Sequence, residues 1–207
     1  MTITEMKIEE HPFPPFVPTN ATKLIIGSIP PQRFCNQKEN GISLYPDDVN
    51  FYYGSRDNSF WFLIGQVFNI SFEMTNTENA ITQRKQFLTD NFIGITDVVD
   101  KCSRLNDSAE DKNLQKIEYK KLGQLLMDNP QIDTLIYTSD FVKQQVNKIF
   151  NIYHSSSGNT KKEFKVKILD KPYCVKVLYS PSPNGLRNMG KDGKQRRQKQ
   201  YQEFLTT

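Results

Sequence analysis

The sequence predicts one α/β domain, a three-layer α/β/α sandwich around a mainly parallel sheet of about four strands. Two observations predict this class: short apolar runs recur at wide intervals, and helix-like segments separate them. Strands buried on both faces of a parallel sheet read as continuous apolar runs, and helices usually connect such strands. A length of 207 residues suits a single domain spanning 1–207, and no repeat or linker divides it.

The first 22 residues form a Pro-rich lead-in to the first strand. The stretch 11–18 (HPFPPFVP) contains four of the eleven prolines. Proline fixes φ and donates no backbone hydrogen bond, so this stretch cannot be helical. We expect it to lie extended across the domain.

Four apolar runs are predicted as the strands of the sheet. They are residues 23–26 (KLII), 94–99 (GITDVV), 134–137 (TLIY) and 174–179 (CVKVLY). Residues 162–169 are expected to pair with 173–178 as a hairpin that turns at 170–172.

Apolar residues at helical spacing predict the helices. The first follows Asn58 and Ser59, which are favourable helix-start residues. A third helix opens at Ser139 or Asp140 and ends before a polar loop at 154–159 (HSSSGN). The four predicted helices cover residues 60–68, 114–126, 142–153 and about 194–204.

The positive charge is concentrated at the C-terminus. The chain has a net charge of +4, and residues 184–207 contain six Lys or Arg against two Asp or Glu, which accounts for the whole excess. The segment 190–207 is therefore predicted as a basic C-terminal helix. Such a segment suits contact with a polyanion, although a solvated helix explains the charge equally well.

Cysteine usage and hydropathy exclude several classes. Cys35, Cys102 and Cys174 are too far apart in sequence for a zinc, iron–sulfur or CxxC site. No run approaches the roughly 18 apolar residues of a membrane span, and residues 1–10 lack the apolar core of a secretory signal. We expect a cytoplasmic monomer with no metal, no cofactor and no membrane partner.

Ligands of open α/β sheets bind outside the carboxyl ends of the strands, which directs attention to the segments after them. Residues 27–31 (GSIPP) follow the first strand, and 180–188 (SPSPNGLRN) follow the last. Residues 51–61 (FYYGSRDNSFW) combine aromatics with a polar turn, and 94–104 read GITDVVDKCSR.

Together these four blocks resemble the uracil-DNA glycosylase superfamily in their residues, order and spacing. Within it, FYYGSRDNSFW is most similar to the hypoxanthine-DNA glycosylase pattern Tyr-Tyr-Ala-His-Pro-Arg-Asn-x-Phe-Trp. The resemblance implies hydrolysis of the N-glycosidic bond of a deaminated base in DNA, as a step of base excision repair. Hypoxanthine is the implied base, with uracil as a second possibility. Such a monofunctional enzyme needs no metal, cofactor or covalent nucleophile.

The resemblance also implies a pocket that holds the extruded base. Tyr53 matches the position of a base-stacking aromatic, although ordinary packing also explains it. Ile29 departs from the pattern, since many members carry Asp or Asn there to hold the catalytic water. Ser55 stands where the pattern has His. Ser180 stands where many relatives carry His or Asn. The implied pocket residues are Gly27, Ser28, Ile29, Pro30, Tyr53 and Ser180.

Asn58 is the implied catalytic residue, because it matches the catalytic Asn of the hypoxanthine group. An amide can orient water and stabilise developing charge but is a poor general base. Asp57 replaces an Arg of the pattern, and its carboxylate could act as the base. Helix capping explains both residues equally well.

The last loop and the basic segment are the implied DNA contacts. Leu186 would fill the vacated stack, and its polar neighbours would bind phosphates or the opposite base. The expected contacts are Ser182, Asn184, Gly185, Leu186, Arg187, Arg196 and Arg197. A solvated surface loop explains the same residues without DNA.

Other enzyme classes are disfavoured, and two alternatives stay open. His11 and His154 lie in segments that offer no Ser–His triad, and no Walker loop or GxGxxG occurs. The departures at Ile29, Ser55 and Ser180 favour, as one alternative, an inactive relative that only binds nucleic acid. The other is an enzyme that acts on a free nucleoside.

Overall fold

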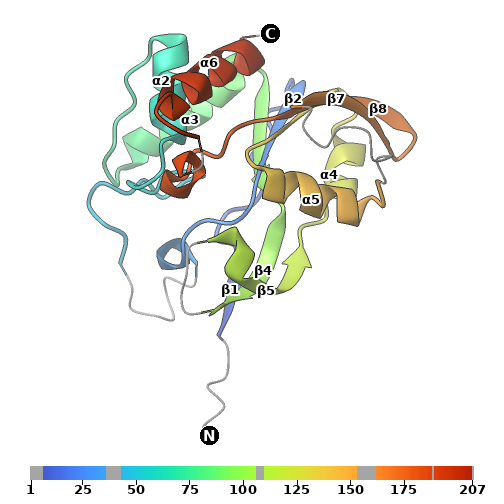
Figure 1. The fold of residues 1–207 in the computed structure, drawn as a ribbon, viewed down its shortest axis with the longest axis horizontal. Coiled ribbons are helices and arrows are strands. Elements are labelled where there is room, and N and C mark those ends of the chain that lie inside the picture. The colour runs from blue at the N-terminus through green and yellow to red at the C-terminus, as the bar shows by residue number, and fades with distance from the viewer. Residues whose placement is uncertain (1–6, 36–42, 106–109, 153–161, 188, 207) are drawn as a thin grey trace, which may run out of the picture.

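The computed structural model describes residues 7–35, 43–105, 110–152, 162–187 and 189–206. Within these residues the chain forms two β-sheets and five α-helices (Figure 1). Tyr153, the predicted loop 154–159 and Asn188 lie outside the described residues. No helix in the described part of the chain is both long and apolar enough to cross a membrane.

The central sheet has five strands in the order β3-β2-β6-β8-β7, so it is larger than predicted. The first four run parallel, while β7 is antiparallel to β8, as the predicted hairpin requires. The sheet is therefore mixed. The strands are β2 (Lys23–Gly27), β3 (Ile93–Asp97), β6 (Thr134–Tyr137), β7 (Glu163–Ile168) and β8 (Lys171–Val177).

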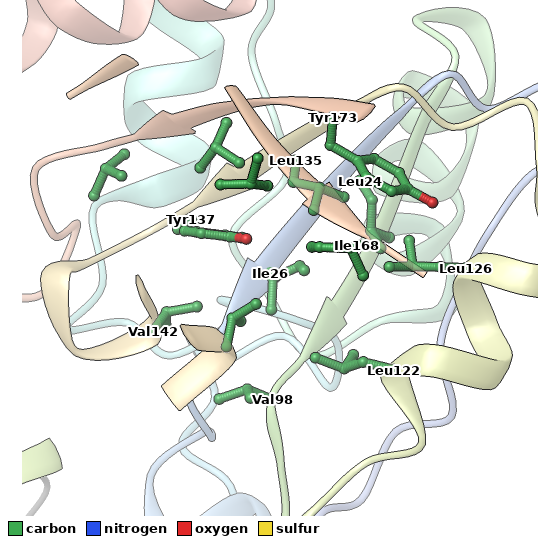
Figure 2. Packing of buried hydrophobic residues seen from close by; sticks show 14 of the residues in the cluster. Leu24, Ile26, Val98, Leu122, Leu126, Leu135, Tyr137, Val142, Ile168 and Tyr173 are labelled. Atoms are coloured by element: carbon green, nitrogen blue, oxygen red, sulfur yellow. The ribbon is translucent and has the colours of Figure 1, made fainter. Parts of the chain in front are cut away.

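The two faces of the central sheet are buried by different helices. In β2, Leu24 and Ile26 belong to one apolar cluster and Ile25 to the other, as the alternation of a strand requires. The first cluster includes residues of α4 (Leu122–Asp128) and α5 (Asp140–Ile149), and Figure 2 shows its side chains. The second includes residues of α2 (Phe60–Phe68), α3 (Glu78–Asp90) and α6 (Gly193–Leu205), which lie on the other side of the sheet (Figure 1).

A second, antiparallel sheet contains β1 (Ile8–Glu10), β4 (Val99–Arg104) and β5 (Leu114–Tyr119). The predicted strand 94–99 ends at Asp97, because Val99 begins β4 of this other sheet. The predicted helix 114–126 was wrong in its first half, which is β5. Between two β4–β5 pairs the register advances by two residues in β4 and three in β5, and Lys116 has φ 48°. Because of this bulge, Leu114 and Ile117 both pack in the first apolar cluster although they are three residues apart in the sequence. That spacing imitates the spacing of a helix.

Three predicted helices are present; α2 and α6 lie close to their predicted bounds, whereas α5 ends at Ile149, four residues before its predicted end. Helix α2 follows Ser59, and α5 is capped by Ser139, whose hydroxyl accepts a hydrogen bond from Val142 N at 3.2 Å. Helix α6 covers the predicted C-terminal helix. Helix α3 was not predicted, because one of its few buried residues is Arg84, which interrupts the apolar stripe.

The described part of the lead-in contains no helix and runs along both sheets. Its strand β1 pairs with β4, and His11 N donates to Asp100 O at 2.7 Å. Further along, Phe16 exchanges backbone hydrogen bonds with Ile95 of β3. The lead-in thereby places His11 close to the carboxyl end of β3.

Candidate active-site pocket

A pocket of about 450 Å³ lies at the carboxyl ends of the parallel strands. Its walls come from the segments after β2, β3, β6 and β8, and from the aromatic turn before α2. The sequence-predicted residues that line it are Ser28, Ile29, Pro30, Tyr53, Asp57, Asn58, Ser180, Ser182, Asn184 and Gly185. The fold therefore gathers three of the four sequence blocks around one cavity, and the fourth contributes Asp97.

Gly27 lies between two oxygen atoms at the base of this arrangement. It is the last residue of β2 and pairs in register with Asp97, the last residue of β3. A Cβ atom at position 27 would lie 2.1 Å from both Asp97 Oδ1 and the Tyr53 hydroxyl oxygen. Any larger residue would have to displace one of these two side chains, because real Cβ atoms do not approach oxygen so closely. Gly27 is not itself part of the pocket wall.

Tyr53 is held in a strained, fixed position. Its backbone has φ 55°, which few residues other than glycine adopt. Its hydroxyl lies 2.8 Å from Thr138 Oγ1, and its ring stacks on Phe60 with centroids 4.3 Å apart. Burial raises the pKa of the Tyr53 phenol, so it remains a neutral hydrogen-bonding group. The stack on Phe60 shows that packing orients this ring.

Asn58 lines the pocket and also caps α2. Its Oδ1 accepts a hydrogen bond from Phe60 N at 2.9 Å, which satisfies one of the unpaired amides at the helix N-terminus. Among the described residues no hydrogen bond engages its Nδ2. The capping interpretation is therefore observed, and the amide NH2 remains available at the pocket.

Asp57 lies at the rim of the pocket. Its side chain is 60% exposed, and Oδ2 pairs with Arg33 Nη2 at 3.2 Å. Arg33 in turn binds Asp48 with two hydrogen bonds of 2.7 and 2.8 Å and donates to Ser55 Oγ at 2.7 Å. Sequence reasoning missed Arg33, which here contacts the serine that replaces the histidine of the family pattern.

Asp48 holds Arg33 in place beside the pocket. Its burial raises the carboxyl pKa, but hydrogen bonds from Arg33 and from the backbone amides of Arg56 and Tyr45 outweigh that effect. The pKa of Asp48 therefore lies below its usual value. An ionised Asp48 fixes Arg33, and Arg33 fixes the loop that carries Asp57.

Three further carboxylates, those of Asp97, Glu110 and Asp111, line the pocket and were not predicted. Asp97 Oδ2 lies 2.7 Å from His11 Nε2, a pairing that the sequence did not predict. Asp111 begins the short 3-10 helix η3 (Asp111–Asn113). Burial raises the pKa of Asp111 to about 6, and a hydrogen bond with Ser28 opposes that rise.

Arg197 does not face solvent, so its predicted DNA contact is revised. The residue is 5% exposed. Its Nη1 donates to Ser180 O at 3.1 Å and Ser182 O at 3.5 Å, while Nη2 donates to Ser59 Oγ at 3.2 Å. Arg197 therefore connects α6, the last loop and the start of α2. Arg196, by contrast, is exposed.

A carboxylate holds the last loop at the pocket mouth. Glu110 Oε1 accepts from Asn184 Nδ2 at 3.3 Å and from Arg187 Nη1 at 2.9 Å. Leu186 ends the short helix η4 (Pro183–Leu186). A Cβ at Gly185 would lie 2.4 Å from Ser180 O, so this turn also requires glycine. Leu186, Arg187 and Arg196 lie outside the pocket wall.

Comparison with solved structures identifies a similar fold. A solution NMR structure described as a "putative Uracil DNA glycosylase" from Methanosarcina acetivorans superposes with a TM-score of 0.57 at 18% sequence identity. The match covers 97% of this chain and 100% of that one. The two proteins share a fold.

No protein-family model matches the chain, and no curated protein sequence matches it. In the described residues, no group of three or more His, Cys, Asp or Glu side chains is arranged to hold a metal ion.

Proposed function

We propose that the protein is a monofunctional DNA glycosylase that removes a deaminated base by hydrolysing its N-glycosidic bond, in base excision repair. Hypoxanthine is the proposed base, with uracil as the second candidate. The fold shared with the Methanosarcina protein supports a DNA glycosylase-like function. The sequence resemblance, centred on residues 51–61, supports hypoxanthine.

One observation carries the proposal: the matching blocks line a single pocket. Its volume of about 450 Å³ is in the range of small-molecule sites, which suits an extruded base with its sugar. Its lining includes aromatic, amide and hydroxyl groups, which can recognise a base face and a base edge. The three-layer α/β/α arrangement that we infer from the two apolar clusters places this pocket at the edge where such folds bind ligands.

Each proposed pocket residue has a distinct role. Tyr53 forms a wall against which the base lies, and the Nδ2 of Asn58 donates a hydrogen bond to the base or sugar. Ser28 and Ser180 offer hydroxyls to the base edge, and Ile29 and Pro30 exclude water. Asn184, Arg187 and Arg196 contact phosphates once DNA replaces Glu110 as the partner of the first two.

The test is a panel of oligonucleotides that contain deoxyinosine or deoxyuridine, single-stranded and opposite each normal base. Alkali cleaves at an abasic site, so the product reports base removal. We expect a product from at least one deoxyinosine substrate, and at least a tenfold lower rate for Asn58→Ala. Asn76→Ala, an exposed Asn outside the pocket wall, is the control and should retain the wild-type rate. Intact substrates throughout the panel would refute the proposal.

The alternative function is a nucleic-acid-binding protein without catalysis. It is favoured by Ile29, an apolar side chain in the pocket where relatives carry Asp or Asn, and by the capping bond of Asn58 Oδ1. Salt-dependent binding without abasic product would support it. Turnover of free deoxyinosine would instead indicate a nucleoside hydrolase.

A further inference from the structure

We infer that Asp97 is the carboxylate that accepts a proton from the attacking water, and that His11 and Lys120 position it. The inference rests on the proposed function, because it assumes hydrolysis at the sugar C1′ in this pocket. It assigns the general base that neither the first loop nor the Asn58 block supplies.

The first argument is the place of Asp97. It ends β3 at the carboxyl edge of the sheet, lines the pocket and is 6% exposed. Its Oδ1 and the Tyr53 hydroxyl approach the same point beside Gly27. Among the described residues no hydrogen bond engages Oδ1. Oδ1 thus lies beside the Tyr53 hydroxyl, and both residues belong to the pocket lining.

The second argument is how the other oxygen is held. Oδ2 lies 2.7 Å from His11 Nε2, and the His11 side chain is fully buried. Lys120 Nζ, which has only donors, lies 2.9 Å from His11 Nδ1, and Phe13 N donates to the same nitrogen at 3.1 Å. Nδ1 also lies 3.0 Å from Phe13 O, and with partners on both nitrogens the ring is fixed with Nε2 directed at Asp97 Oδ2.

This arrangement orients Asp97, because His11 holds Oδ2 while no hydrogen bond among the described residues engages Oδ1. Lys120 is fixed in turn, since Nζ also donates to Phe13 O at 2.6 Å. Lys120, His11 and Asp97 form a chain from the start of α4 to the pocket.

The other polar groups fit the role of base less well. Asn58 is an amide whose Oδ1 accepts from Phe60 N, and Asp57 is largely exposed and paired with Arg33. Ile29 has no proton acceptor. Two carboxylates remain among the described lining residues: Asp111 bonds to Ser28, which we assign to the base edge, and Glu110 is held by Asn184 and Arg187.

The step balances without any further reactant. A water oxygen forms a bond to C1′ while its proton passes to Asp97 Oδ1. The C1′–N bond breaks, and its electron pair leaves with the base. The base then takes up one proton, from Asp97 or from solvent, so the products are the free base and an abasic sugar carrying the new hydroxyl. The oxocarbenium-like sugar is stabilised by the nearby negative charge before the transfer is complete.

The test compares Asp97→Asn with the wild type in single-turnover cleavage of the best substrate of the panel, together with binding to DNA that carries a tetrahydrofuran abasic analogue. We expect the rate to fall at least about 100-fold, because general base catalysis contributes about that much, with the Kd for DNA changed less than threefold. Asp128→Asn, an exposed carboxylate on α4, is the matched control and should retain the wild-type rate. A rate of Asp97→Asn within threefold of the wild type would overturn the inference while leaving the glycosylase proposal intact. A wild type that removes no base would overturn both.

Chemical rescue covers the case in which Asp97→Asn does not fold. For Asp97→Ala, added formate should restore at least tenfold of the lost rate, since a free carboxylate can occupy the vacated space. Folded Asp97→Ala without rescue, together with a near-normal rate for Asp97→Glu, would count against the assignment.

The positioning role of His11 has its own readout. His11→Gln keeps an Nε2–H donor, whereas His11→Phe removes it. We expect Phe to lower kcat at least tenfold with little change in KM, and Gln to recover most of the loss. Equal losses in both variants, together with equal losses of stability, would show a purely structural role and overturn this part.

Discussion

At the scale of single residues, the pocket depends on one close approach. Gly27 leaves space in which Asp97 Oδ1 and the Tyr53 hydroxyl lie near each other, and Tyr53 adopts a strained backbone to reach it. Strain of this kind costs roughly 1–3 kcal/mol and persists only where the surroundings fix it. Phe60 and Thr138 supply that fixation.

Gly27→Ala tests this geometry. The new methyl group would displace Asp97 or Tyr53, so we expect at least a 100-fold loss of base removal and a destabilisation of about 1–3 kcal/mol. Gly123→Ala, within α4, is the control. The new Cβ would meet only the side chains of Leu169 and Phe150, at 3.7 Å, and alanine favours a helix. Thermal melts and the abasic-product assay measure both effects. A fully active Gly27→Ala would mean that the two oxygens need not be close.

Asp111→Asn tests the raised pKa of that carboxyl. Because the folded pKa of about 6 exceeds the ordinary 3.8, the ionised form destabilises the fold above pH 6, and this cost disappears as the pH falls below about 4. The asparagine should therefore be more stable than the wild type at pH 8, by at most about 3 kcal/mol before solvent screening, and equal near pH 4. Denaturant unfolding at several pH values measures this. A gain that is the same at all pH values would contradict the burial argument.

The sequence predicted several of these residues but not their partners. Tyr53, Asn58 and Ser180 were found because each lies in a contiguous block. Asp97 ended an apolar run that was predicted to continue to residue 99, so the rule that ligands lie at strand ends was not applied to it. His11 and Asp97 are 86 positions apart, and no local pattern joins them.

At the scale of secondary-structure elements, α6 is part of the pocket's support rather than a separate basic arm. Tyr201 and Leu205 are buried in the second apolar cluster, and Arg197 binds the carbonyls of the last loop. Charge counting could not separate Arg197 from Arg196, because which face of a helix is buried depends on what packs against it.

Arg197→Ala should therefore act on stability. Removing the guanidinium leaves Ser180 O, Ser182 O and Ser59 Oγ without their donor, and we expect a loss of about 2–4 kcal/mol in the free energy of unfolding. Arg196→Ala, on the exposed face, should change stability by no more than about 0.5 kcal/mol. Urea unfolding measures both. Equal stabilities of the two variants would contradict the connecting role of Arg197.

The misassigned elements share a physical cause. In β5 a bulge gave a strand the spacing of a helix, and in α3 a buried arginine hid a helix's apolar face. Both are tertiary effects. The parallel strands and α2, α5 and α6 were predictable because their patterns follow local geometry without such interruptions.

At the scale of the whole molecule, the fold brings sequence-distant segments to one edge of the central sheet. His11 of the lead-in contacts Asp97, and Arg187 of the last loop donates a hydrogen bond to Glu110. The second sheet carries β4 and β5, which connect the end of β3 to the segments that hold Asp111 and Lys120. The pocket thus depends on both sheets. Its residues come from several separate sequence blocks, so no single block could predict the site.

The C-terminal charge gives a prediction at this scale. Lys194, Arg196 and Lys199 are exposed on α6, so changing all three to Gln should leave stability nearly unchanged. It should weaken DNA binding and reduce the slope of log K against log salt by up to about 3, since each phosphate contact contributes about one unit.

Removing residues 190–207 should instead unfold the chain, because it deletes Tyr201, Leu205 and Arg197, and each large apolar side chain alone contributes about 1.5–3 kcal/mol. Circular dichroism melts and binding titrations at three salt concentrations distinguish the two. A truncated chain that still melts cooperatively would show that α6 is a detachable arm, and an unchanged salt slope in the triple variant would show that the basic face does not follow the phosphates.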